Sequence, residues 1–189
     1  YRAFYALPHL KNNSGSHTGA IFGVTNMINK LINDLSPKYI CAVFDARGKN
    51  FRHRLYKDYK SNRKSMPEEL SEQVDPIFDF LKFMGIQIIQ QPDVEADDVI
   101  ASLVNDHSSK TKILISSGDK DLAQLVNKNV QLINSLDGKQ LNEGDVKKKF
   151  GVAPNQIKDY LTLVGDASDN IPGVSKIGPK TAVTLLEKY

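Results

Sequence analysis

Short apolar runs that alternate with helical patterns are the feature that most constrains the fold of this chain. The runs are too short for buried helices and are rich in residues typical of strands, and they occupy residues 39–44, 86–89, 113–116 and 130–133. Apolar residues recur at helical spacing between them, over residues 20–35, 67–84 and 95–104. This alternation predicts an α/β fold in which a parallel sheet is covered by helices on both faces.

The two ends of the chain show a different pattern. Residues 1–7 are typical of the end of a helix that stops at Pro8, and a polar loop follows over residues 11–19. After residue 142 only helical patterns remain, interrupted at 151–154 and 169–178. We therefore expect an α/β domain over residues 1–141 and a separate helical lobe over residues 142–189.

The apolar runs also bear on the cellular setting. The longest is far shorter than the ~20 residues that a membrane span requires, so no membrane association is expected. The single cysteine, Cys41, lies in the run 39–44 and is expected to be a buried core thiol. One unpaired cysteine fits a reducing, cytoplasmic setting.

Acidic residues follow several of the expected strands. One acid directly follows the run 39–44, two lie just beyond the run 113–116, and three occupy the first turn of the helix that follows the run 86–89. Because the carboxyl ends of parallel strands meet at one edge of a sheet, we expect these side chains to converge. They are Asp45, Glu95, Asp97, Asp98, Asp119 and Asp121.

Such a cluster of acids has two explanations. Interaction with the helix dipole, worth ~0.3–1 kcal/mol, explains one or two acids at a helix start but not those at the other strand ends. Carboxylates that lie close together repel and stay ionised at neutral pH only with cations between them. Mg²⁺ and Mn²⁺ prefer such oxygen ligands, so metal binding is the better account.

A second pair of acids extends the prediction. Asp166 and Asp169 are three residues apart, so on a helix their side chains can face the same way. With Asp119 and Asp121 they can form a second pole of the cluster, and two ions ~3.5–4 Å apart would activate water and stabilise the leaving oxygen of a phosphodiester. No Ser-His-Asp or Cys-His pattern competes, and surface positions are expected for His9, His17, His53 and His107.

Basic residues are concentrated in one segment, although the net charge is only +3. They are Arg47, Lys49, Arg52, Arg54, Lys57, Lys60, Arg63 and Lys64, and the single acid among them is Asp58. Phe51, Tyr56 and Tyr59 are interleaved with them, which a solvated amphipathic helix could also explain. We favour DNA binding, because phosphate contacts and stacking of tyrosines on bases account for both kinds of residue.

The segment 170–182 has the layout of a phosphate-binding turn. Gly173 and Gly178 bracket an apolar and polar turn, and Pro179 suits the first position of a new helix. Backbone amides at that helix start, together with Lys180 and Thr181, can hold a DNA phosphate irrespective of base sequence. A plain turn between two helices is the alternative.

Five of these segments occur in the order known from one family. The segments, at residues 44–46, 94–98, 117–121, 165–174 and 177–182, resemble the 5′→3′ exonuclease domain at the front of bacterial DNA polymerase I, within the wider flap-endonuclease family. The resemblance implies a PIN-like (Rossmann-like) α/β domain with a helical arch. It also implies a C-terminal helix–three-turn–helix DNA-binding module.

The resemblance implies roles for individual residues. The first metal group is Asp45, Glu95, Asp97 and Asp98, and the second is Asp119, Asp121, Asp166 and Asp169. The residues matched to contacts with the reacting phosphate region are Tyr59, Lys60, Arg63 and Arg2. The remaining DNA contacts are expected from Arg47, Lys49, Arg52, Lys57, Lys64, Gly173, Val174, Lys176, Gly178, Lys180 and Thr181. The implied cofactors are two or more Mg²⁺ or Mn²⁺ ions and a K⁺ ion at residues 173–178.

The implied function is metal-dependent hydrolysis of DNA with a 5′ flap, nick or gap, and of RNA-primer 5′ ends, in primer removal and excision repair. A cytoplasmic, nucleoid-associated monomer followed by a polymerase region is expected. In the family a strand ending in Asp-Gly-Ser, whose Asp is a metal ligand, precedes the segment matched by residues 1–3. We therefore expect a chain that is truncated at both ends.

Three alternatives stay open or are set aside. A module that binds branched DNA without cutting it would keep the basic segment but lack a complete metal site. A relative that processes RNA would need neither the arch nor the glycine turn. A nucleotide-binding enzyme is disfavoured, because no glycine-rich phosphate loop follows an expected strand.

Overall fold

The computed structural model describes residues 1–7, 10–134 and 138–189, so the expected helix end at Pro8 and the surface position of His9 lie outside the described residues. The chain forms two compact units, each discontinuous in sequence. Unit 1 comprises Tyr1–Phe44 and Lys64–Gln90, and unit 2 comprises Asp45–Arg63 and Gln91–Tyr189. The predicted domain boundary near residue 142 falls within unit 2.

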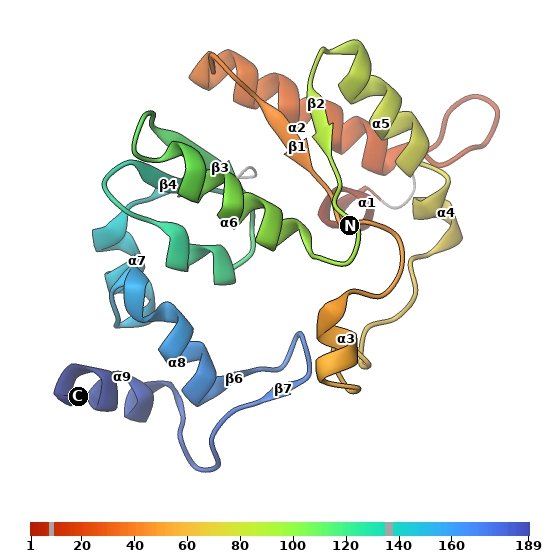
Figure 1. Ribbon diagram of the computed structural model, residues 1–189. Helices are drawn as coiled ribbons and strands as arrows, with labels where there is room; N and C mark the ends of the chain where they lie inside the picture. The colour runs from red at the N-terminus through yellow and green to blue at the C-terminus, as the bar shows by residue number, and fades with distance from the viewer. Residues whose placement is uncertain (8–9, 135–137) are drawn as a thin grey trace. The chain divides into compact units, whose positions relative to one another are not determined.

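Unit 1 is built from two parallel strands and helices. Its elements are α1 (Arg2–Ala6), α2 (Gly19–Leu35), β1 (Cys41–Val43), α4 (Glu68–Ser71), α5 (Val74–Phe83) and β2 (Gln87–Ile89) (Figure 1). Ala42 pairs with Ile88 in the parallel ladder. The predicted strands and the helices at the start of the chain are confirmed, although each strand is shorter than the apolar run that predicted it.

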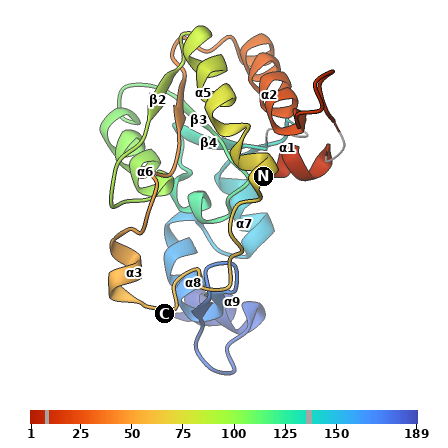
Figure 2. The same cartoon turned by 90° about the vertical axis from the view of Figure 1, so that its right-hand side faces the viewer.

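The core of unit 1 forms where α5 packs beside α2 (Figure 2). Leu81 and Ile77 of α5 and Ile28 of α2 are buried there. The single helix predicted over residues 67–84 is wrong, because the structure divides it into α4 and α5. Pro76 in the first turn of α5 accounts for the break, since its ring excludes the carbonyl of residue 72. Gly85 ends α5 with a positive φ of 71°, as expected of a residue that follows a helix.

The position of Cys41 corrects a second prediction. Cys41 is exposed and is not a core thiol. Side chains alternate between the faces of a strand, and here Ile40, Ala42 and Phe44 pack against the core of unit 1. Cys41 therefore projects from the opposite face of β1.

Unit 2 holds a mixed three-stranded sheet and most of the helices. Its elements are α3 (Phe51–Leu55), α6 (Ala96–His107), β3 (Ile113–Ser116), the 3₁₀-helix η1 (Asp121–Leu125), β4 (Val130–Ile133), β5 (Gln140–Leu141), α7 (Glu143–Phe150), η2 (Pro154–Gln156), α8 (Ile157–Val164), β6 (Gly165–Asp166), β7 (Ile171–Pro172) and α9 (Pro179–Lys188). β3 and β4 are parallel, as predicted, but β5 runs antiparallel to β4. β5 has two residues, too few to show the alternation that reveals a strand.

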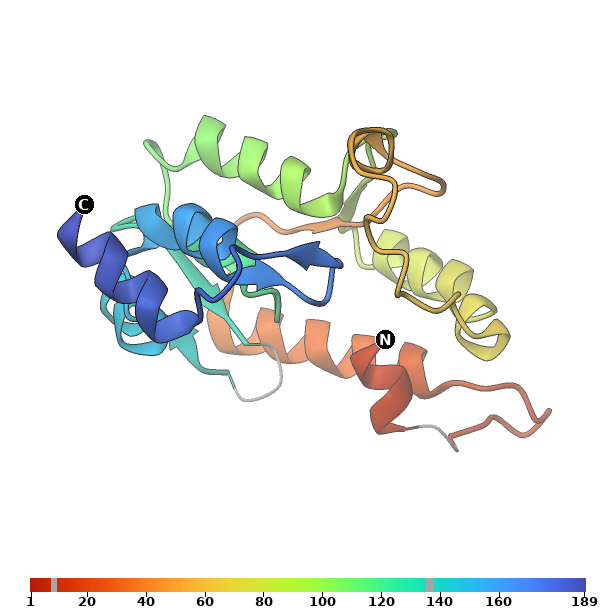
Figure 3. The ribbon, with the colours of Figure 1, turned by 90° about the horizontal axis from the view of Figure 1, so that it is seen from below.

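The core of unit 2 joins this sheet to the helices around it. Val130 of β4, Val146 of α7 and Ile157 of α8 are fully buried, and Val104 of α6 packs with them. α8 and α9 pack together, and β6 and β7 extend from the end of α8 (Figure 3). This core places the start of α6, the turn after β3 and the end of α8 within one unit.

The segment after α8 corrects the expectation that only helices follow residue 142. β6 and β7 form an antiparallel hairpin whose turn is residues 167–170, so Asp166 and Asp169 do not lie on a helix. They are joined instead across this turn, where the amide of Asp169 donates to the carbonyl of Asp166 at 3.3 Å. The hairpin needs two glycines, because a Cβ at Gly165 would lie 2.3 Å from the backbone nitrogen of Gly173 and one at Gly173 would lie 2.4 Å from the backbone carbon of Val164.

The basic segment is only partly helical. α3 has five residues, and turns follow it through residue 62. Across residues 1–7, 10–134 and 138–189, no helix has the length and apolarity that a crossing of the lipid bilayer would require.

Candidate functional site

Acidic side chains from three loops of unit 2 repel one another at the start of α6. Burial, together with the charges of Asp119 and Asp45, raises the pKa of Asp97 to about 6. Asp45 is held there because its Oδ1 accepts a hydrogen bond of 2.7 Å from the amide of Ala96. The predicted convergence of acids from the ends of different strands is therefore present.

Asp121 shows the same uncompensated charge. Burial raises its pKa to about 6, with Asp119 and Asp166 adding to the effect. Its Oδ1 is buried and has no hydrogen-bond partner among the described residues. Its amide donates to Oδ1 of Asp119 at 3.0 Å, so the turn after β3 holds both side chains close together. A buried carboxylate oxygen without a donor is an acceptor for a cation.

Glu95 lies in a different environment, among donors. Lys60 Nζ lies 2.5 Å from its Oε1, the Tyr59 hydroxyl donates to its Oε2 at 2.8 Å, and Asn50 Nδ2 donates to Oε1 at 2.8 Å. Burial opposes ionisation of Glu95, but the hydrogen bonds from Lys60 and Tyr59 outweigh it, so its pKa is lowered. Glu95 is thus a fixed carboxylate within a basic group.

Three further acids are paired with basic side chains. Asp98 receives two hydrogen bonds from Arg52, at 2.6 and 2.7 Å, and also accepts the amide of Glu95 at 2.9 Å. Asp169 is paired with Arg63 and lies 3.7 Å from Lys60 Nζ. Lys120 Nζ lies 2.9 Å from Oδ1 of Asp166. Four of the eight predicted metal ligands are therefore paired with basic side chains, and we call them the paired group: Glu95, Asp98, Asp166 and Asp169. Asp97, Asp119 and Asp121 repel one another, and we call them the repelling acids.

Tyr59 links the paired group together. Its side chain is 5% exposed, and its hydroxyl lies 2.8 Å from Glu95 and 2.9 Å from Oδ2 of Asp169. Burial, with these two acceptors, raises the pKa of the phenol. The predicted stacking of this ring on a base does not fit, because the ring is enclosed and contacts His53 edge-on at 5.3 Å.

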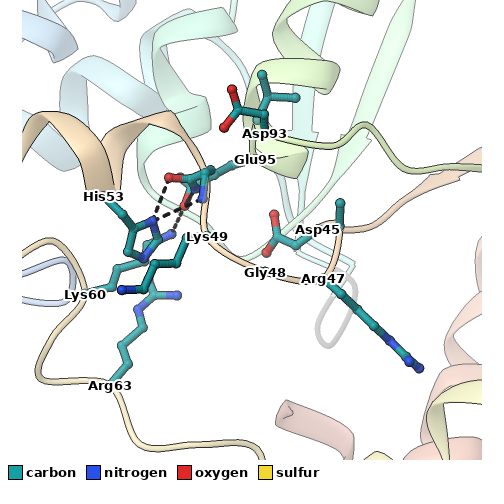
Figure 4. A pocket seen from close by; sticks show the side chains of 12 residues that line it. Asp45, Arg47, Gly48, Lys49, His53, Lys60, Arg63, Asp93 and Glu95 are labelled. Carbon is teal, nitrogen blue, oxygen red and sulfur yellow. Dashed lines mark hydrogen bonds and ion pairs between the residues drawn. The ribbon is translucent and has the colours of Figure 1, made fainter.

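A pocket of about 160 Å³ lies beside the paired group. Figure 4 shows His53, Lys60 and Glu95 gathered on one side of it and the Arg47 side chain directed away from them. The backbone of residues 45–50 forms another part of its wall. Basic and acidic side chains thus line one small opening, which suits a phosphate group held near carboxylates.

Three residues of this site were missed from the sequence. Asn50 is buried and caps α3 by accepting from the amide of Arg52 at 3.0 Å, in addition to its bond to Glu95. His53 was expected at the surface but is half-buried, with Nδ1 2.8 Å from Oδ1 of Asn50. An asparagine just before a short amphipathic pattern is a helix-start signal that could have indicated Asn50. Lys120 lies between two predicted ligands, and no sequence pattern separates it from an ordinary turn lysine.

The other predicted residues belong to unit 1, line the pocket or are exposed on unit 2. Arg2 and Lys64 belong to unit 1, where Arg2 begins α1. Arg47, Lys49 and Lys57 are exposed in unit 2, and the first two also line the pocket. The predicted DNA contacts of the C-terminal turn are also exposed, namely Gly173, Val174, Lys176, Gly178, Lys180 and Thr181. Their roles stay predictions.

As they stand, no three His, Cys, Asp or Glu side chains within the described part of the chain enclose a point where a metal ion would fit. The chemistry of the repelling acids nevertheless fits a hard cation, because Asp97 and Asp121 have raised pKa values and no described residue donates to Asp121 Oδ1.

Two family models match the chain. The model of the 5'-3' exonuclease N-terminal resolvase-like domain matches residues 1–151, and that of the 5'-3' exonuclease C-terminal SAM fold matches residues 152–189. A 5'-3' exonuclease of Aquifex aeolicus is 46% identical over 100% of this chain and 66% of its own length. The DNA polymerase I of Pseudomonas aeruginosa is 45% identical over 98% of this chain and 20% of its own length. The chain thus spans less than two thirds of each of these relatives.

Solved structures share the fold. T5 5'-exonuclease with bound zinc is 22% identical, with a TM-score of 0.76, over 100% of this chain and 72% of that chain. The catalytic core of Rad2 in complex with a DNA substrate is 19% identical, with a TM-score of 0.63, over 100% of this chain and 57% of that chain. The predicted PIN-like α/β fold is confirmed.

Proposed function

The chain belongs to the 5'-3' exonuclease family, and from this premise we propose that it hydrolyses DNA phosphodiester bonds at or near 5′ ends, using bound divalent metal ions. The observation that carries the proposal is the division of the acids in unit 2. The repelling acids include Asp121, whose buried Oδ1 accepts no hydrogen bond from any described residue, whereas the paired group is held by basic side chains that include Lys60 and Arg63. A cation site beside a cationic group is what hydrolysis of a phosphodiester needs.

We assign the cation site to the repelling acids together with Asp45, whose charge contributes to the raised pKa of Asp97. Asp45, Asp97, Asp119 and Asp121 would hold Mg²⁺ or Mn²⁺, which prefer carboxylate oxygens and retain bound water. Related T5 nucleases have been crystallised with metal ions, zinc among them, which supports a metal site of this kind. When bound, two such ions supply an activated water and stabilise the leaving oxygen.

The basic side chains have a separate role in this proposal. Lys60 and Arg63 offer positive charge to the phosphate that is cut, and Arg63 is half-exposed and so accessible to it. The hydroxyl of Tyr59 lies within hydrogen-bonding distance of both Glu95 and Asp169 and shares its one proton between them, so it links these two acids. Arg52 holds Asp98 in a bidentate pair, so we assign both residues to the support of Glu95.

The exposed basic and glycine-rich segments would bind the rest of the DNA. Arg47, Lys49 and Lys57 are exposed, and the first turn of α9 offers backbone amides and the side chain of Lys180 to a phosphate. A bacteriophage T5 flap endonuclease and the Rad2 core have been solved with DNA. We propose 5′ flaps, nicks, gaps and RNA-primer 5′ ends as substrates, with K⁺ bound at residues 173–178.

The cellular role follows from the relatives. The Pseudomonas aeruginosa relative is a DNA polymerase I, so we propose that this chain acts in primer removal and excision repair, on chromosomal DNA in the cytoplasm, in a protein that continues into a polymerase region.

One observation favours the second candidate, binding of branched DNA without cutting. Four of the eight predicted ligands are already paired with basic side chains, which weakens their attraction for metal. Such a module would bind flap DNA through the exposed basic residues and would have no metal-dependent chemistry.

Cleavage of an end-labelled 5′-flap DNA distinguishes the two. The chain is assayed with Mg²⁺ and with EDTA, beside Asp97→Asn, Asp121→Asn and the exposed control Asp106→Asn. Mg²⁺-dependent cutting near the junction that is lost in the first two variants and kept in the control supports the nuclease. Tight, salt-sensitive binding without any cutting supports the binding module instead.

A further inference from the structure

Two turns of unit 2 that are far apart in the sequence are joined by side-chain amides. The turn 58–62 follows α3, and the turn 167–170 joins β6 to β7. Nδ2 of Asn170 donates to the carbonyl of Asp58 at 2.9 Å and to Oγ of Ser61 at 3.0 Å. Nδ2 of Asn62 donates in the opposite sense, to the carbonyl of Ala167 at 2.8 Å. We call these contacts the turn clamp.

Backbone contacts complete the clamp. The amide of Lys60 donates to the carbonyl of Asp169 at 2.9 Å, and Nε of Arg63 lies 3.4 Å from the carbonyl of Ser168. Both turns are therefore held at several points along their length.

The clamp contains two unusual backbone conformations. Lys60 has a φ of 55° and Asn170 a φ of 58°, in the left-handed region. Asparagine tolerates this region better than most residues, whereas lysine adopts it only where the surroundings hold it there. The hydrogen bond from the backbone amide of Lys60 to the carbonyl of Asp169 holds the residue in this conformation. The side chain of Asn170 adds to this by binding Asp58 and Ser61, which precede and follow Lys60 in the turn.

The conformation of Lys60 decides where the basic side chains point. Tyr59 and Lys60 reach Glu95, and Arg63 reaches Asp169, all from this one turn. Neither Asn62 nor Asn170 has a hydrogen bond to a carboxylate among the described contacts. Their influence on the site acts through the turn.

We propose that Asn170 and Asn62 are positioning residues, which hold the turn 58–62 so that Lys60 and Arg63 face the carboxylates. This inference rests on the proposed nuclease function. In this proposal the tip of the β6–β7 hairpin has two roles. It carries Asp169, and it supports the turn that holds Lys60 and Arg63.

The test compares two substitutions that remove an amide with one that does not touch the clamp. Asn170→Gly keeps the positive φ accessible, Asn62→Ala removes the second amide, and Asn105→Ala changes an exposed asparagine of α6. We expect kcat for 5′-flap cleavage to fall between tenfold and about 100-fold in each clamp variant, with KM changed less than about threefold, because misplacement of a reacting group mainly slows the chemical step. Asn62→Gln, which keeps an amide, should recover part of the rate.

A second readout does not need activity. Trypsin should cut after Lys57, Lys60 or Arg63 several times faster in the clamp variants than in the wild type or Asn105→Ala, at equal thermal stability. Unchanged proteolysis together with unchanged kcat would overturn the clamp. A wild-type chain that fails to cut flap DNA would overturn the proposed nuclease, and the proteolysis comparison would still decide the clamp.

Discussion

The ammonium group of Lys60 lies 2.5 Å from Oε1 of Glu95, and the two side chains are only 16% and 12% exposed. A pair so enclosed is strongly coupled, because little water screens it. Tyr59 and Asn50 complete the donors around Glu95. The side chain of Lys60 is therefore paired with Glu95, and its backbone amide is hydrogen-bonded to Asp169 in the β6–β7 hairpin.

Lys60→Ala should slow cleavage by about 100-fold while lowering stability by only about 1–2 kcal/mol, since Tyr59 and Asn50 still donate to Glu95. Single-turnover cleavage of flap DNA and urea unfolding measure the two effects. Lys110→Ala, at an exposed lysine, is the control. A variant that unfolds but retains the wild-type rate per folded molecule would remove Lys60 from the mechanism.

Asp97→Asn should stabilise the metal-free chain at pH 7.5. The folded carboxyl keeps its proton up to about pH 6, whereas its ordinary pKa is 3.8, so the folded state binds more protons and loses stability as pH rises between those values. That loss is complete above pH 6, and after allowance for partial exposure we expect a gain of about 1 kcal/mol, or ~2–4 °C in Tm.

Thermal unfolding in EDTA at pH 5 and pH 7.5 measures this effect. The gain should be smaller at pH 5, where the wild-type carboxyl is largely protonated. Mg²⁺ should raise the Tm of the wild type more than that of the variant. Equal Mg²⁺ effects in both would show that Asp97 takes no part in binding the cation.

Gln73→Ala should destabilise unit 1 by about 2–3 kcal/mol. Oε1 of the buried Gln73 accepts the amides of Ala20 and Ile21, at 2.8 and 3.3 Å, at the start of α2, and its Nε2 donates to Glu69 at 2.7 Å. Alanine leaves those buried groups without partners. Urea unfolding beside Glu72→Ala, its exposed neighbour, is the measurement, and equal midpoints would contradict the assignment.

Gly173→Ala should disrupt the β6–β7 hairpin, because the added carbon would lie 2.4 Å from the backbone of Val164. Gly178→Ala should fold normally, since no described atom lies within 4 Å of a Cβ there. Circular dichroism melting compares the two. We expect a loss of about 2 kcal/mol or more for the first and less than about 0.5 kcal/mol for the second. A normal Tm in Gly173→Ala would show that the backbone shifts to accept the methyl group.

Much of the fold could be predicted because periodicity is a local property. The strands at 113–116 and 130–133 and the helix over residues 20–35 were recognised from apolar spacing alone, and the structure confirms them. The two-residue strands β5, β6 and β7 were missed, because their formation depends on partners and not on their own pattern. Pro76 was overlooked as the break between α4 and α5.

The candidate site, like the fold, could be predicted only in part. Acids that follow strands were predicted to converge, and Asp97, Asp119 and Asp121 do. The division into a paired group and repelling acids was not predicted, because ion pairs such as Arg52 with Asp98 join residues 46 positions apart. The burial of Tyr59 and His53 is likewise a tertiary property that the basic pattern of their segment conceals.

The turn clamp has a consequence for synthesis of the chain. The side chain of Asn170 binds a carbonyl that lies 112 positions earlier, and unit 2 is interrupted by Lys64–Gln90 of unit 1. Chains emerge from the ribosome N-terminus first, and contacts of such long range form late. A nascent chain that ends before Asp169 therefore has the cationic turn and the first acids, joined by contacts such as that of Lys60 with Glu95, but lacks the hairpin side of the clamp. The complete site assembles only when nearly the whole of this sequence has been made.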